Sequence, residues 1–91
     1  MRFEWDDAKA AENLGKHGVS FPEAATVFAD PLSWTYPDPD HSDDEERYLT
    51  IGLSARGAVL IIGHADEGDT VRIITARRAT NHERRFYEAQ R

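Results

Sequence analysis

The strongest constraint on the fold is a run of three strand-like segments that are joined by very short turns. Residues 47–54 alternate apolar and polar side chains, and residues 58–65 are apolar on both faces. Residues 70–77 form a third such segment, in which strict alternation places Arg77 on the same face as Ile73. The two connections are three and four residues long and contain glycine. They therefore predict hairpins, and an antiparallel sheet with residues 58–65 at its centre.

Three helices are predicted around this sheet, each with its own start signal. Asp6 is the N-cap of a helix that reaches His17 and stops at Gly18. A serine or threonine followed three residues later by glutamate forms a capping box, which begins a second helix at Ser20 and a third at Thr80. The apolar side chains expected to pack these last two helices on the sheet are Phe21, Ala24, Ala25 and Phe28, then Phe86 with Tyr87.

Short strands over residues 3–5 and 32–36 complete the order β-α-α-β-β-β-β-α. Helices packed to one side of a mostly antiparallel sheet make an α+β fold. The 91 residues show no linker or repeat, so we expect a single small domain over residues 1–91. The chain has no cysteine, which excludes disulfides and thiolate chemistry. Neither a membrane span nor a signal peptide is recognisable, so a cytoplasmic location is expected.

Charge is distributed unevenly along the chain. The net charge of −6 argues against a nucleic-acid-binding protein. Residues 1–46 carry a net charge of −9, however, whereas residues 47–91 carry +3 and the segment from Thr70 onward carries +4. The first half suits a basic partner and the second a phosphate-bearing one, and two solvated faces without a partner are the alternative.

The acidic segment 37–46 is the first candidate for a metal site. If Asp38 began a calcium-binding EF-hand loop, the sixth residue would be Asp43 instead of glycine, and the twelfth would be Leu49 instead of glutamate. The segment is therefore predicted to be a solvated acidic loop. The histidines show no metal-ligand spacing either, so neither a metal nor a cofactor is expected; they are His17, His41, His64 and His82.

Three long blocks carry a family resemblance. They are residues 3–31, residues 40–57 and residues 72–88, and together they cover nearly the whole chain. The last block opens with RIITAR, which resembles the RIISAR signature of the BrnT toxins with Thr75 in place of serine, an exchange that keeps the hydroxyl group. Glu67 stands where many members have arginine. The sequence thus resembles the BrnT family of type II toxin–antitoxin pairs.

The resemblance implies a RelE-like fold and an endoribonuclease that inhibits translation. It also implies a BrnA-like antitoxin with a ribbon-helix-helix part that binds DNA. In that family an antitoxin dimer bridges two toxins in a heterotetramer, and this complex represses its own operon. DNA would then be bound only through the antitoxin.

Metal-free RNA cleavage requires a base for the 2′-hydroxyl proton, an acid for the leaving 5′-oxygen, and cations for the phosphate. Arg77 is the strongest candidate cation, because a guanidinium at the end of an apolar strand suits bidentate phosphate binding. A salt bridge to an acidic residue of the first helix is its alternative role. Trp34 and Tyr36 share a strand face, and they either stack RNA bases or pack in the core. The other predicted RNA contacts are Arg72, which could pair with a carboxylate instead, Arg78, which could simply face solvent, and Arg84.

Candidates for proton transfer come from two helices and one loop. Lys16 and His17 lie together at a helix end, where a charge cap is their alternative role. His41 belongs to the acidic loop, whose carboxylates favour its charged form, and could instead anchor that loop. Glu83 and Tyr87 share one face of the last helix, although the capping box already offers Glu83 a structural role.

Two functions follow from these observations. The first is a ribonuclease toxin with Arg77 at its site. The second is a catalytically inactive module of the same fold, which only binds a partner protein and takes part in autoregulation of the operon. The net negative charge favours the second function, and the basic last segment favours the first.

Overall fold

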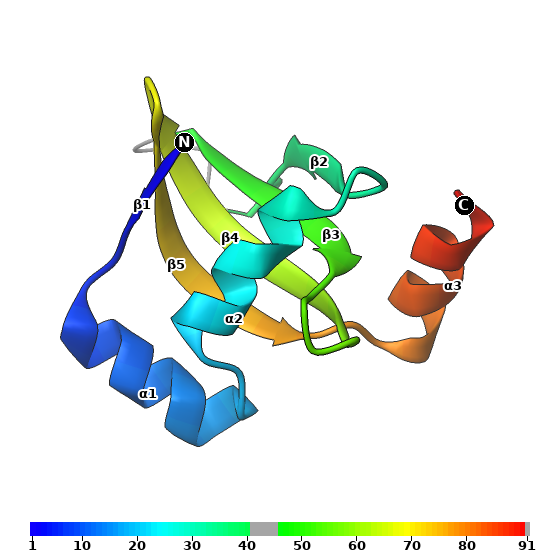
Figure 1. The fold of residues 1–91 in the computed structure, drawn as a ribbon, viewed down its shortest axis with the longest axis horizontal. Helices are drawn as coiled ribbons and strands as arrows, with labels where there is room; N and C mark the ends of the chain where they lie inside the picture. The colour runs from blue at the N-terminus through cyan, green and yellow to red at the C-terminus, as the bar shows by residue number, and fades with distance from the viewer. Residues whose placement is uncertain (41–45, 91) are drawn as a thin grey trace.

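The computed structural model describes residues 1–40 and 46–90, and its elements follow the predicted order (Figure 1). The acidic loop residues 41–45, including His41, lie outside the described residues. No helix within the described residues is long and apolar enough to cross a membrane. The elements are β1 (Arg2–Glu4), α1 (Asp7–His17), α2 (Phe21–Thr26), the 3-10 helix η1 (Val27–Ala29), β2 (Trp34–Pro37), β3 (Arg47–Leu53), β4 (Val59–Glu67), β5 (Thr70–Arg78) and α3 (Asn81–Ala89).

The strands form one sheet in the order β1-β5-β4-β3-β2. Only β1 pairs in parallel, and the other neighbours are antiparallel. The predicted α+β class and the central position of β4 are therefore confirmed. Strand β2 begins at Trp34, two residues later than expected, because Asp30 organises a turn: its carboxylate accepts from the Leu32 N–H and its carbonyl from the Ser33 N–H.

Helix α2 lies across one face of the sheet, and α1 lies beside the second half of β5 (Figure 1). The predicted stripe of α2 is confirmed, since Phe21 and Ala24 are fully buried and Ala25 and Phe28 pack against the same core. Helix α1 contributes fewer apolar contacts to this core. The side chain of Asn13 connects it to β5 through hydrogen bonds with the backbone of Ala76. The main core cluster contains Val19, Phe21, Ala24, Val27, Leu60, Ile62, Val71, Ile73 and Ala76.

Helix α3 packs on the opposite face, against a smaller cluster of Ile51, Ile61 and Tyr87, so the expectation that all helices pack to one side of the sheet is wrong. Tyr87 is 1% exposed, and its hydroxyl donates to the Asp30 carboxylate. The expectation that Phe86 anchors this helix is wrong, because Phe86 remains 43% exposed. Tyr87 is buried in its place, because its hydroxyl has a hydrogen-bond acceptor in Asp30.

A β-bulge between β4 and β5 changes which side chains share a face. Gly63 pairs with Thr75 and His64 pairs with Ile73, so Ile74 is the extra residue on β5. Ile73 and Ala76 consequently both lie on the face of the sheet that packs against α2. The prediction that Arg77 lies on the face of Ile73 is therefore wrong: one extra residue reverses the alternation that follows it.

Candidate functional site

The ion pair between Arg77 and Glu83 lies where β5 ends and α3 begins. The Arg77 Nη1 donates to Glu83 Oε1 at 2.8 Å, and Nη2 donates to Oε2 at 3.0 Å. The Arg77 side chain is 41% exposed and that of Glu83 is 25% exposed. A salt bridge was the alternative role predicted for Arg77, but the partner belongs to the last helix and not to the first. Part of the guanidinium remains open to solvent.

Glu83 has a second contact that fixes its position. The capping box is present as predicted: Glu83 Oε1 accepts from the Thr80 N–H at 2.8 Å, and the Thr80 hydroxyl accepts from the Glu83 N–H. The hydrogen bond from Arg77, with a further contribution from Thr80, lowers the pKa of Glu83 to about 2. The carboxylate is thus ionised at neutral pH and is a weak proton acceptor.

Tyr36 approaches the same ion pair from β2, the edge strand that lies three strands away from β5 in the sheet. Burial raises the pKa of its phenol, and the negative charge of Glu83 raises it further, while Arg77 acts in the opposite direction. The phenol therefore stays protonated and can donate a hydrogen bond at neutral pH. The sequence predicts only packing or stacking for Tyr36, because its proximity to Arg77 depends on how the strands and α3 are arranged in the fold.

An apolar pocket of about 330 Å³ adjoins the ion pair, and we call it the aromatic pocket. Trp34 and Phe86 form part of its wall, with ring centroids 6.3 Å apart and an interplanar angle of 86°. Trp34 is 49% exposed, which rules out core packing as one of the two alternatives for this residue. The pocket is lined by Trp34, Tyr36, Ile51, His82, Glu83 and Phe86.

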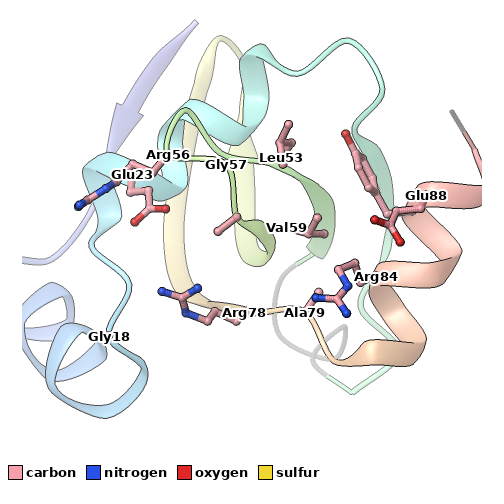
Figure 2. A pocket seen from close by; sticks show the side chains of 12 residues that line it. Gly18, Glu23, Leu53, Arg56, Gly57, Val59, Arg78, Ala79, Arg84 and Glu88 are labelled. Carbon is pink, nitrogen blue, oxygen red and sulfur yellow. The ribbon is translucent and has the colours of Figure 1, made fainter.

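A larger groove of about 790 Å³ lies on the other side of α3, and we call it the arginine groove. It brings together Arg78 and Arg84, two of the predicted RNA contacts, with Arg56, which the sequence analysis did not single out. Figure 2 shows Arg78 projecting from β5 and Arg84 from α3, with Arg56 and Glu23 from the elements across the groove. Arg72, the third predicted contact, lies near the start of β5, where it pairs with Ala65 of β4.

The other predicted residues lie at varying distances from this cluster. Lys16 and His17 end α1 and line a separate pocket with Thr75, two positions before Arg77 on β5. The Tyr87 side chain is buried between α3 and the sheet, as described above. His64 is also buried, and its ring nitrogens contact Asp66 and Thr50.

The donor groups of the described chain do not suggest a metal centre. Within residues 1–40 and 46–90, no group of three histidine, aspartate or glutamate side chains is arranged to hold a metal ion. The candidate site itself presents a cation, a fixed carboxylate, a phenol and aromatic surfaces.

Comparison with known proteins gives two findings. Residues 5–83 match the family model described as the ribonuclease toxin, BrnT, of type II toxin–antitoxin systems. The crystal structure of the Brucella abortus ribonuclease toxin, BrnT, is similar with a TM-score of 0.65 and 21% sequence identity, over 89% of this chain and 99% of that one. At this identity the structural match supports the fold. No curated protein matches the sequence.

Proposed function

Because the chain belongs to the BrnT family of ribonuclease toxins of type II toxin–antitoxin systems, we propose that it cleaves RNA without a metal ion at the surface around Arg77. The observation that carries this proposal is the ion pair of Arg77 with Glu83, which holds a partly exposed guanidinium at the end of β5. A positioned cation of this kind stabilises the charge that develops on a phosphate when the 2′-hydroxyl attacks it.

Glu83 is proposed to position Arg77 and not to transfer the proton. Its pKa of about 2 makes it a poor base at neutral pH, whereas its two oxygens fix both terminal nitrogens of Arg77. Proton transfer is proposed for His17, with Lys16 as a neighbouring phosphate anchor, and for His41. His17 and Lys16 line one pocket with Thr75, which is close to Arg77 along β5.

Tyr87 and the arginines are proposed to support the site in other ways. Tyr87 anchors α3 through Asp30, so its contribution to activity is indirect. Arg78 and Arg84 are proposed to follow the RNA backbone along the arginine groove, where guanidinium groups can bind successive phosphates. Arg72 is proposed to contact the RNA backbone separately from the arginine groove, because it lies near the start of β5 and on the opposite face from Arg78.

The finer biological role is proposed from the family. We infer that the chain acts in the cytoplasm and inhibits translation, and that a BrnA-like antitoxin with a ribbon-helix-helix part neutralises it. An antitoxin dimer would bridge two toxins, and the heterotetramer would bind operator DNA through the antitoxin. The acidic first half of the chain, with a net charge of −9, suits contact with a basic partner.

The test is RNA cleavage by the purified protein in the presence of a chelator. We expect cleavage by the wild type, strong loss in Arg77→Ala, and only partial recovery in Arg77→Lys, because lysine cannot form the bidentate contacts. Arg85→Ala is the matched control, since Arg85 is an exposed arginine of α3 that lines neither pocket. Thermal melts of all variants establish that they are folded.

The outcomes separate the two functions. Cleavage that needs a divalent ion would overturn the metal-free mechanism. No cleavage by the folded wild type, on free RNA or with ribosomes, would leave the inactive partner-binding module as the function. Loss of folding in Arg77→Ala would show that Arg77 is required for stability, and Arg77→Lys would then decide its role in cleavage.

A further inference from the structure

Trp34 and Phe86 are two large aromatic side chains that the fold leaves in contact with solvent. They come from β2 and α3, and they approach each other across the aromatic pocket. Both are about half exposed, although burying either would stabilise a small domain by about 2 kcal/mol. Exposed apolar surface that lines a cavity is typical of a binding site.

The shape of the aromatic pocket suits one flat ring. Its volume is about 330 Å³, and Ile51 lines it together with the two aromatic residues. Because the Trp34 and Phe86 rings are nearly perpendicular, a guest ring can stack on the face of one and meet the edge of the other. An amphipathic helix would need a longer groove with several successive anchoring positions.

The polar groups around the aromatic pocket suit a base with its attached phosphate. The phenol of Tyr36, the imidazole of His82 and the carboxylate of Glu83 line the same cavity and can bind the polar edges of a base. Glu83 also holds Arg77 through two hydrogen bonds. One nucleotide could therefore place its base in the pocket and its phosphate on the guanidinium.

We propose that the aromatic pocket is a base-binding subsite, which takes one unpaired nucleobase of the RNA beside the phosphate held by Arg77. This inference rests on the proposed RNA substrate. It assigns Trp34 and Phe86 to substrate positioning and predicts that the protein binds single-stranded RNA, since only an unstacked base can enter the pocket.

The test uses an RNA that cannot be cleaved through its 2′-hydroxyl. The chain has two tryptophans, so Trp5→Phe leaves Trp34 as the single fluorescent reporter. A mixed-sequence 2′-O-methyl oligoribonucleotide should quench this fluorescence on binding. Loss of a stacking ring in Phe86→Ala should weaken binding about 10- to 100-fold. Trp34→Ala should have a similar effect when a labelled oligonucleotide reports binding, and Trp34→Phe should restore most of the affinity.

Salt dependence distinguishes stacking from charge. Trp34→Ala should lower affinity without changing the slope of affinity against salt concentration, whereas Arg77→Ala should reduce that slope. Leu14→Ala is the control, because Leu14 is an equally exposed apolar residue on the distant helix α1. An unchanged affinity in both Trp34→Ala and Phe86→Ala would overturn the inference.

The outcomes also separate this inference from the proposed function. Quenching of Trp34 by the oligonucleotide in Trp5→Phe, together with no RNA cleavage by the wild type, would support the subsite and refute the enzyme. A wild type that cleaves RNA, with Trp34→Ala and Phe86→Ala cleaving equally well, would refute the subsite alone. If these variants kept RNA binding but escaped the antitoxin, the pocket would be a protein-docking site and the inference would be wrong.

Discussion

The ion pair of Arg77 with Glu83 is expected to stabilise the fold in a pH-dependent manner. Folding lowers the pKa of Glu83 from 4.5 to about 2, mainly through the hydrogen bond from Arg77 and partly through Thr80. This difference corresponds to about 3 kcal/mol of stabilisation of the ionised, folded form. Because the Arg77 side chain is 41% exposed, water and salt screen the pair, and we expect a contribution of about 1–2 kcal/mol.

The sign of the pH dependence follows from the direction of the pKa change. A carboxyl whose pKa falls on folding stabilises the folded state while it is ionised. The contribution of Glu83 is therefore complete above its unfolded pKa of 4.5, and it is lost as the pH falls towards 2. Glu83→Gln should lower the free energy of unfolding at neutral pH. Glutamine is also accepted at this position of a capping box, so the substitution isolates the charge.

A double-mutant cycle with Arg77→Met measures the pair directly. Urea denaturation of the wild type, both single variants and the double variant gives the coupling energy. We expect about 1–2 kcal/mol at neutral pH and less than half of that near about pH 3. A coupling energy below about 0.3 kcal/mol at neutral pH, or an equal value at both pH values, would refute this reasoning.

Two further substitutions test how the helices are attached. Asn13→Ala removes three hydrogen bonds, of 3.0, 2.8 and 3.1 Å, and leaves the N–H and C=O of Ala76 without them, so the unfolding free energy should fall by about 2–4 kcal/mol. An unchanged urea midpoint would contradict that role of Asn13. Tyr87→Phe should cost about 1–2 kcal/mol through the lost bond to Asp30, with RNA cleavage per folded molecule unchanged. Strong loss of cleavage with an intact fold would instead place Tyr87 in the chemistry.

The helix starts could be predicted from sequence because each depends on residues that are close in the chain. The side chains of Asp6, Ser20 and Thr80 each accept a hydrogen bond from the backbone N–H three residues later. These contacts need no tertiary partner. The hairpins were equally local, and together these signals were sufficient for the element order and the α+β class.

The faces of β5 could not be predicted by counting, because a bulge depends on the neighbouring strand. Gly63 was the available hint, since an isolated glycine inside a strand often marks a bulge or a close approach. A Cβ at Gly63 would lie 2.5 Å from the Thr75 hydroxyl oxygen, so any other residue would force Thr75 to move where the strands change register. The same bulge turns Arg77 away from α1 and α2 and towards α3.

The contact that defines the candidate site combines a local signal with a tertiary one. From the sequence, the cap and a catalytic role of Glu83 are alternatives, and the predicted partner of Arg77 lies on the first helix. A carboxylate can accept several hydrogen bonds, so Glu83 binds the Thr80 N–H and both terminal nitrogens of Arg77 at once. The start of α3 and the position of the guanidinium are thereby coupled. The bond by which Tyr87 holds α3 against Asp30 joins residues 57 positions apart in sequence, so no local pattern could have revealed it.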